Sequence, residues 1–171
     1  MKIAYIIAFQ NFRDEEYFVP KEVFENQGIQ VSTFSTVMGN ALGSMGGEVE
    51  IDGVLADINI DLFDAVLLAG GPGAKEYTEN EECLEIIREA RNKGKLIGAI
   101  CIAPTILAAA GVLRGETATV WTSTMDKSAI QYIEDQGANF IDEDVVVSGK
   151  IITASGPDAA RKFAQTIIEN L

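Results

Sequence analysis

Cys101 is the residue best placed to act as a nucleophile. It follows a short apolar run, Leu96–Ile100, which predicts a buried strand, and it precedes an apolar segment from Pro104 that predicts a helix. A thiol in such a strand-to-helix turn is exposed at the end of a sheet, near the free N–H groups of a helix N-terminus. Those groups are expected to lower the pKa of the thiol, and the thiolate is the reactive form. We therefore predict a reactive cysteine, with a merely packed thiol as the alternative, since cysteine is often buried.

The second cysteine provides a contrast. Cys83 lies in the middle of a predicted helix, on an apolar stripe with Ile86, Ile87 and Ala90, so we expect it to pack in the core. Two cysteines are too few for a disulfide framework, and no cleavable signal segment opens the chain. These features predict a reduced, cytoplasmic protein.

A carboxyl group is the proton carrier that this sequence offers to Cys101. The chain has no histidine, which excludes Ser-His-Asp and Cys-His catalytic units and histidine-ligated metal sites. Glu15 and Glu16 begin a predicted helix after the first strand, where acids are also favoured for purely structural reasons. If one of them turns toward Cys101, burial beside the thiol is expected to raise its pKa and let it share a proton with sulfur.

A glycine-rich segment at residues 70–73 follows another apolar run. It matches neither the dinucleotide-binding fingerprint nor the phosphate-binding P-loop. A tight turn is the simpler interpretation. The functional alternative is that a backbone N–H of this segment, together with the N–H of Ile102, forms an oxyanion hole beside Cys101.

The elements that must position these residues alternate along the chain. Short apolar runs predict strands, and 3.6-residue patterns predict helices. Asp14 is expected to cap the first helix. Strands are expected at 2–8, 29–36, 63–69, 96–100 and 117–121, helices at 14–27, 80–92, 104–110, 125–136 and 157–170, a loop or small hairpin at 37–53, and a hairpin at 144–154.

This alternation predicts one α/β domain over residues 1–171. We expect a mostly parallel sheet with helices on both faces, flavodoxin-like or Rossmann-like. Ligands bind beyond the carboxyl ends of the strands in such sheets. Site residues are therefore expected in the segments that follow strands, namely 9–16, 70–74, 101–104, 121–124 and 155–158.

Composition excludes several classes of function. The chain has 13 Lys and Arg against 26 Asp and Glu, a formal net charge of −13, which disfavours binding to nucleic acid or to anionic membranes. Residues 96–113 carry no charge, but Gly98, Pro104 and Gly111 interrupt them. We interpret this stretch as a buried strand and helix rather than a membrane span. No cofactor and no metal are expected.

Several of these segments together resemble the DJ-1/PfpI family. The resemblance rests on the AICIAP run around Cys101, the spacing from Glu16 to Pro20, the LAGGPGA segment and the C-terminal DEDVVVSGKIITASGPDAA run, and it covers essentially the whole chain. It implies a flavodoxin-like three-layer sandwich with a cysteine nucleophile elbow, in a homodimer or larger homo-oligomer. It also implies that Cys101 is the nucleophilic, oxidation-prone cysteine, that Glu16 contacts its sulfur, and that Gly71 and Ile102 supply oxyanion-hole amides.

The chain departs from the family's protease-like branch at one position. That branch has histidine directly after the cysteine, whereas this sequence has Ile102, which cannot carry a proton. By the same resemblance, Trp121 and Thr122 are expected in the pocket where some relatives supply a polar or histidine group. Peptidase or glutaminase activity by the family's usual mechanism is therefore disfavoured.

Four functions stay open on this reasoning, the last of them a degenerate family member with a structural role. The first is glyoxalase-like or deglycase-like chemistry on small reactive carbonyls in stress protection, with Cys101 as nucleophile and Glu16 as proton carrier. The second is a non-enzymatic redox sensor in which peroxide oxidises Cys101. The third is the intracellular cysteine protease or amidase that the family label implies. The expected partner is a small electrophile or peroxide.

Overall fold

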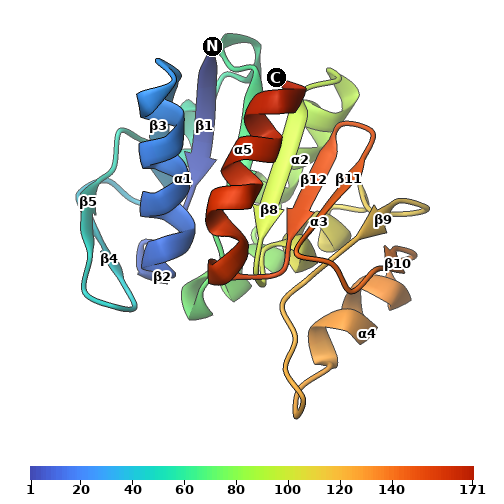
Figure 1. Ribbon diagram of the computed structural model, residues 1–171. Coiled ribbons are helices and arrows are strands. Elements are labelled where there is room, and N and C mark those ends of the chain that lie inside the picture. Colours follow the sequence, from blue (N-terminus) through green and yellow to red (C-terminus); the bar gives the residue numbers. More distant parts are fainter.

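A seven-stranded sheet runs through the middle of the computed structural model, which describes residues 1–171 (Figure 1). All neighbouring strands are parallel except the pair β11–β12, which forms the predicted C-terminal hairpin. In order across the sheet, the strands are β11 (Val145–Ser148), β12 (Ile151–Ala154), β8 (Leu96–Ile100), β7 (Ala65–Leu68), β1 (Lys2–Ile6), β3 (Gln30–Ser35) and β6 (Gly53–Val54).

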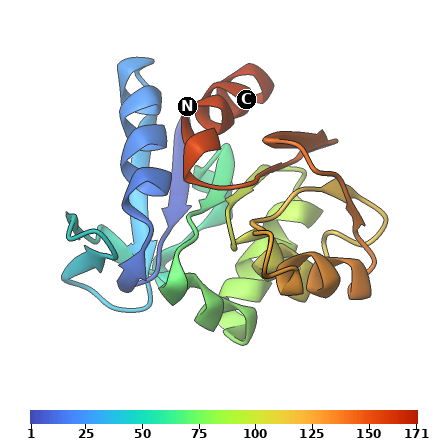
Figure 2. The same cartoon turned by 60° about the horizontal axis from the view of Figure 1, so that its bottom comes forward.

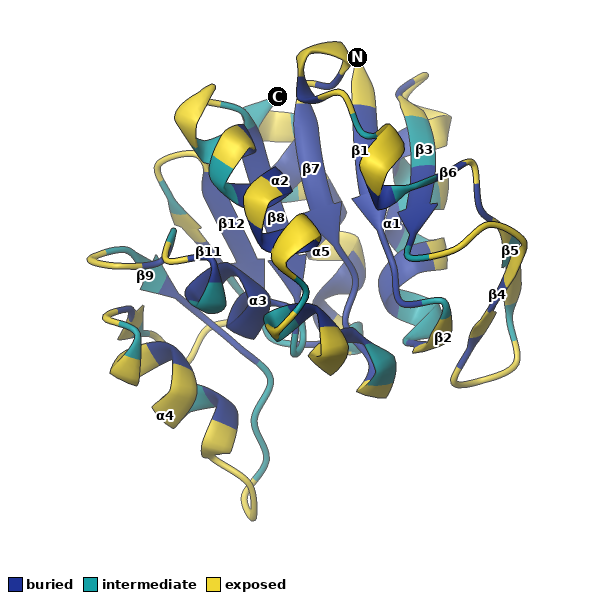
Figure 3. Cartoon of the chain, turned by 180° about the vertical axis from the view of Figure 1, so that it is seen from behind, coloured by how far each residue is buried: buried dark blue, intermediate teal, exposed yellow.

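Helices cover both faces of this sheet and make three layers. Helices α1 (Asp14–Asn26) and α5 (Ala160–Asn170) pack side by side on one face, and α2 (Glu81–Asn92) and α3 (Pro104–Ala109) cover the other (Figures 1 and 3). Strands β7, β8 and β12 are buried throughout (Figure 3), as expected for parallel strands with both faces covered. The predicted flavodoxin-like α/β architecture is therefore confirmed.

Helix α2 illustrates how the sequence specifies an element. The side chain of Asn80 accepts the N–H of Cys83 at 2.9 Å and caps the first turn. The stripe predicted from the sequence is buried, and Cys83 packs in the core with no exposed surface. Gly94 adopts a positive φ of 65°, which glycine tolerates, directly after the helix.

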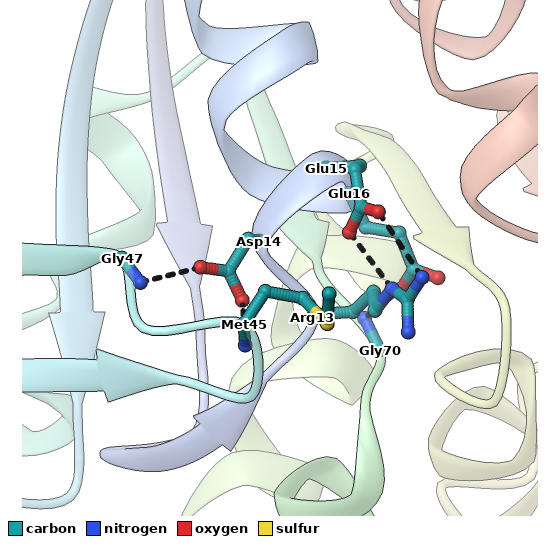
Figure 4. A network of polar contacts seen from close by, with 7 residues as sticks. All are labelled: Arg13, Asp14, Glu15, Glu16, Met45, Gly47 and Gly70. Carbon is teal, nitrogen blue, oxygen red and sulfur yellow. Dashed lines mark hydrogen bonds and ion pairs between the residues drawn. The ribbon is translucent and has the colours of Figure 1, made fainter.

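A small second sheet flanks α1. Strands β4 (Asn40–Gly43) and β5 (Glu48–Glu50) form the hairpin expected between residues 37 and 53, and β2 (Gln10–Phe12) pairs with β4. The prediction that Asp14 caps α1 is wrong. Its carboxylate instead accepts the N–H groups of Met45 at 2.8 Å and Gly47 at 2.6 Å, and so ties the hairpin to the helix (Figure 4).

The region after α3 differs most from the expectation. The strand predicted at 117–121 ends at Ala118, as β9 (Thr117–Ala118), and pairs with β10 (Asn139–Phe140) outside the main sheet. Helix α4 (Ser128–Asp135) begins later than predicted, because the Asp126 carboxylate binds the N–H and hydroxyl of Ser128 and holds the chain in a turn. No helix has the length and apolarity needed to span a membrane, and residues 96–113 form β8, a turn and α3.

Short 3₁₀ segments complete the chain. They are η1 (Leu55–Asp57), η2 (Ile60–Leu62), η3 (Pro72–Thr78) and η4 (Pro157–Ala159). Segments η3 and η4 follow β7 and β12 at the carboxyl edge of the sheet, which Figure 2 turns toward the reader. The loops that follow β1, β7, β8 and β12 therefore share one edge, where a site is expected.

Candidate active site

Cys101 occupies a strained turn between β8 and α3. Its φ is 64°, in the left-handed region that non-glycine residues rarely adopt, at a cost of about 1 kcal/mol or more. Two backbone hydrogen bonds fix this conformation. The N–H of Cys101 donates to the carbonyl of Ala154 at 2.8 Å, and the carbonyl of Cys101 accepts the N–H of Trp121 at 2.8 Å. The elbow is thus held by β12 and by the segment after β9, and its side chain stays partly exposed.

Glu16 is the acid that turns inward. It lies in the first turn of α1 with no exposed surface, and its Oε2 accepts the N–H of Gly70 at 3.0 Å (Figure 4). Its Oε1 is equally buried but has no hydrogen-bond partner. Tyr5 donates its hydroxyl hydrogen to the main-chain carbonyl of Glu16 and secures the start of the helix. Glu15 faces the other way and pairs with the guanidinium of Arg13 at 2.8 Å.

Gly70 lets the Glu16 carboxyl and the Cys101 side chain meet. A Cβ at position 70 would lie 2.6 Å from Oε2 of Glu16 and 2.8 Å from Cβ of Cys101, well inside normal contact distances. The glycine after β7 therefore has a packing role beyond that of a tight turn. The space left by the missing side chain is filled by the carboxyl of Glu16 and the side chain of Cys101.

The thiol of Cys101 does not have the lowered pKa expected from its place at an elbow. Burial and the negative charge of Glu16 raise the pKa of Cys101 well above its usual value. The N–H groups of Gly71 and Ile102 act in the opposite direction but are outweighed. Helix α3 has only 6 residues, and it follows a desolvated sulfur beside a carboxylate. Burial and the neighbouring carboxylate both favour the protonated form of the sulfur.

The carboxyl of Glu16 shows the shift predicted for an acid beside the thiol. Burial raises the pKa of Glu16 to about 7, although the Cys101 thiol, the Gly70 N–H and the charge of Arg13 each lower it. Near neutral pH this carboxyl changes charge readily, whereas the thiol does not. Glu16 is thus poised to accept the thiol proton when sulfur forms a bond.

Two backbone N–H groups face the sulfur. Those of Gly71 and Ile102 are close enough to Cys101 to act on its pKa as hydrogen-bond donors. Neither donates to a backbone carbonyl in the surrounding turns. Gly71 has a φ of 103°, and a Cβ there would overlap the backbone of Asn11 and Arg13. A pair of free amides beside a nucleophile can stabilise an oxyanion.

A cavity of about 370 Å³ opens beside Cys101. All five segments that follow strands contribute to its wall. The lining residues are Arg13, Glu16, Gly71, Pro72, Lys75, Cys101, Ile102, Trp121, Asp126, Ser128 and Pro157.

Thr122 is placed differently from the expectation. It does not line the cavity, because its hydroxyl donates to the main-chain carbonyl of Asp126 at 3.1 Å, within its own loop. Asp126 and Ser128 form that part of the wall instead.

Two basic residues of the cavity wall, Arg13 and Lys75, were not predicted from the sequence. Arg13 falls within the post-strand segment 9–16, whereas Lys75 lies one residue beyond the segment 70–74.

Comparison with known proteins gives a consistent picture. A model of the DJ-1/PfpI family matches residues 1–170. The deglycase PfpI of Pyrococcus furiosus is 32% identical over 157 residues, covering 92% of this chain and 91% of the relative. The glutathione-independent glyoxalase DJR-1.2 of Caenorhabditis elegans is 31% identical, covering 91% and 81%. The crystal structure of a ThiJ/PfpI domain protein from Brachyspira murdochii superposes with a TM-score of 0.93 at 31% identity, covering 99% and 97%.

Proposed function

This chain belongs to the DJ-1/PfpI family, and from that premise we propose that it converts small reactive carbonyl compounds through Cys101 and Glu16. The observation that carries the proposal is the site itself. A strained cysteine, a buried carboxyl with one unpartnered oxygen and two free amides meet at one small cavity. The relatives named deglycase and glyoxalase support carbonyl chemistry of this kind.

The first step is addition of sulfur to an aldehyde. The Glu16 carboxylate accepts the thiol proton while sulfur bonds to the aldehyde carbon, and the carbonyl electron pair moves to oxygen. The N–H groups of Gly71 and Ile102 stabilise the oxygen as its charge develops. Glu16 then returns the proton to that oxygen, which yields a neutral hemithioacetal and leaves the carboxylate free to act again.

For a 2-oxoaldehyde, the same carboxyl completes an internal redox reaction. Glu16 removes the proton from the former aldehyde carbon, and the released electron pair forms an enediolate with its negative charge on the neighbouring oxygen. Glu16 then delivers this proton to the neighbouring carbon, while the hydroxyl proton of the former aldehyde oxygen moves to the neighbouring oxygen. The product is a thioester of Cys101 with a 2-hydroxy acid. Water hydrolyses this thioester and restores the thiol. The net change is addition of one water to the 2-oxoaldehyde, so no external oxidant or reductant is required.

Peptide hydrolysis is not part of this proposal. The chain contains no histidine, and position 102 presents an aliphatic side chain to the cavity. One carboxyl suffices for the sequential proton transfers of carbonyl chemistry, which involve no amine leaving group. The redox-sensor alternative would use the same Cys101, and the relatives named deglycase and glyoxalase favour carbonyl chemistry over it.

Consumption of methylglyoxal with formation of lactate tests the proposal. We expect Cys101→Ser to abolish turnover, and Glu16→Gln to reduce it on the order of 100-fold or more, as for loss of a general acid–base group. Cys83→Ala and Glu15→Gln are the matched controls, since they change the other cysteine and the neighbouring acid, and both should keep most of the activity. Equal, slow consumption by the native protein and Cys101→Ser would refute the enzymatic function.

A further inference from the structure

The cavity holds two cations that the chemistry above does not use for proton transfer. Arg13 and Lys75 both line it, Arg13 from the loop before α1 and Lys75 from η3. They stand out because acidic residues outnumber basic ones by 26 to 13 in this chain. A neutral carbonyl substrate such as methylglyoxal has no group that requires either charge.

Arg13 belongs to the reacting end of the cavity. Its Nε and Nη2 donate to the Glu15 carboxylate at 2.8 and 3.1 Å, and its main-chain N–H donates to the carbonyl of Gly70 at 3.0 Å. Its charge lowers the pKa of Glu16. Arg13 is therefore already engaged with acids around the Cys101–Glu16 pair.

Lys75 is the cation that lacks a partner. Its ammonium group forms no ion pair and no hydrogen bond, whereas Arg13, the other cation of the cavity, is paired with Glu15. The pKa of Asp126 is lowered mainly by its hydrogen bonds from Ser128 and, to a smaller extent, by the charge of Lys75. The Asp126 carboxylate is itself bound to the N–H and hydroxyl of Ser128, at 2.9 and 2.6 Å. Lys75 thus presents a free positive charge to whatever enters the cavity.

The charges of the lining also differ from those of the molecule as a whole. The net charge of the chain is −13, but Arg13 and Lys75 offset Asp126 and the single negative charge available to the Cys101–Glu16 pair. The cavity volume of about 370 Å³ exceeds what the five heavy atoms of methylglyoxal would occupy. Space and one unpaired cation are therefore left over beside the reacting atoms.

We propose that the preferred substrate is a 2-oxoaldehyde that carries an anionic group, with its aldehyde carbon at Cys101 and its phosphate or carboxylate at Lys75. This inference rests on the proposed function and names its substrate class. The anionic group takes no part in the bond changes. One water is added across the oxoaldehyde, the product is the corresponding 2-hydroxy acid, and the phosphate or carboxylate leaves unchanged.

A matched pair of substrates tests this assignment. Hydroxypyruvaldehyde phosphate and hydroxypyruvaldehyde differ only in the phosphate, and kcat/KM is compared for both at one ionic strength, because salt screens exposed charges. We expect kcat/KM of the native protein to be about tenfold or more higher for the phosphorylated compound, mainly through a lower KM. An ion pair between Lys75 and the phosphate near the protein surface can account for a factor of this size. Lys75→Gln should remove most of this preference, and Lys75→Arg should retain it.

Lys127→Gln is the control for long-range charge effects. It makes the same change in net charge at an exposed lysine that does not line the cavity, and it should leave the preference for the phosphate unchanged. Absence of a preference in the native protein, or equal losses in Lys75→Gln and Lys127→Gln, would overturn the inference. If either outcome is found while hydroxypyruvaldehyde is still consumed, only the inference about the anionic group fails and the proposed function is retained. If neither compound is consumed, both proposals fail.

Discussion

Oε2 of Glu16 accepts the N–H of Gly70 at 3.0 Å, while Oε1 of the same carboxyl is buried without a partner. One oxygen therefore fixes the position of the group, and the other is free to exchange a proton. A buried carboxyl with one unpartnered oxygen is costly when charged, and that cost has measurable effects on stability and activity.

Stability should fall as the pH rises through the titration of Glu16. Burial raises the pKa of Glu16 from its usual value of 4.5 to about 7. Between those values the folded protein keeps a proton that the unfolded chain has lost. Glu16 therefore stabilises the fold most below pH 4.5, and this stabilisation is lost as the pH rises to about 7. The free energy of unfolding should fall by about 3 kcal/mol over this interval and should not change further above it on account of Glu16.

Chemical denaturation of the native protein and Glu16→Gln between pH 4 and 8 measures this change. The difference between the two free energies of unfolding should follow the titration, while Glu15→Gln should parallel the native protein. A pH-independent difference would show that the Glu16 pKa is normal.

The rate of the proposed reaction should depend on pH in the opposite sense. The carboxylate form of Glu16 accepts the thiol proton, so kcat/KM for methylglyoxal should rise as the pH increases and level off above about 7. Initial rates from pH 5.5 to 8.5 provide the profile. A flat profile over this range would rule out Glu16 as the proton acceptor.

Alkylation of Cys101 should be slow at neutral pH and accelerate as the pH increases. Burial and the Glu16 charge raise the pKa of the Cys101 thiol, and only the thiolate reacts with iodoacetamide. Intact mass measured against time should show one adduct, because Cys83 is fully buried. Cys101→Ser should show none in the folded state, and rapid labelling already complete at pH 6 would contradict the raised pKa.

Gly70→Ala should impair activity more than stability alone explains. The added Cβ would lie 2.6 Å from Oε2 of Glu16 and 2.8 Å from Cβ of Cys101, so the carboxyl and thiol must move apart. We expect a loss of activity on the order of tenfold or more, as for misplacement of reacting groups, and destabilisation of about 1–3 kcal/mol. Gly28→Ala is the control. It has a φ of 70° with open space around it, so it should cost stability but not activity.

Asp14→Ala should loosen the β4–β5 hairpin without changing the cavity. The carboxylate accepts the N–H groups of Met45 and Gly47, and hydrogen bonds to a charged group contribute about 1.5–3 kcal/mol. Faster hydrogen exchange should be confined to residues 43–48, and activity should persist. Glu22→Ala, an exposed acid on the same helix, should change neither. Unaltered hydrogen exchange in Asp14→Ala would show that the β4–β5 hairpin does not depend on the Asp14 carboxylate for its stability.

The sequence predicted the central layers well, because buried parallel strands have an unmistakable composition. Strand β8 has the predicted bounds, Leu96–Ile100, and helix α2 begins directly after its capping Asn80. Each of the five segments after strands contributes to the cavity wall. The rule that parallel strands end at one edge therefore predicts the position of the cavity from the sequence.

The directions of loop side chains and the direction of the Cys101 pKa shift could not be predicted in this way. Thr122 and Asp126 lie in one irregular loop, and only its hydrogen bonds decide which of them faces the cavity. The Cys101 pKa depends on whether two N–H groups outweigh burial and a carboxylate, and spacing along the chain says nothing about burial. The role of Asp14 could not be predicted because its partners, Met45 and Gly47, lie in a hairpin some 30 residues away.

The two backbone hydrogen bonds that hold Cys101 have a consequence for biosynthesis. Their partners, Trp121 and Ala154, both come later in the chain than the cysteine. A nascent chain emerges N-terminus first, so it exposes Cys101 long before β12 exists to hold its left-handed turn. During synthesis Cys101 is therefore an ordinary flexible thiol, and the strained geometry forms only when residues near the C-terminus take their places. The strained nucleophile can therefore form only after β12 has been synthesised.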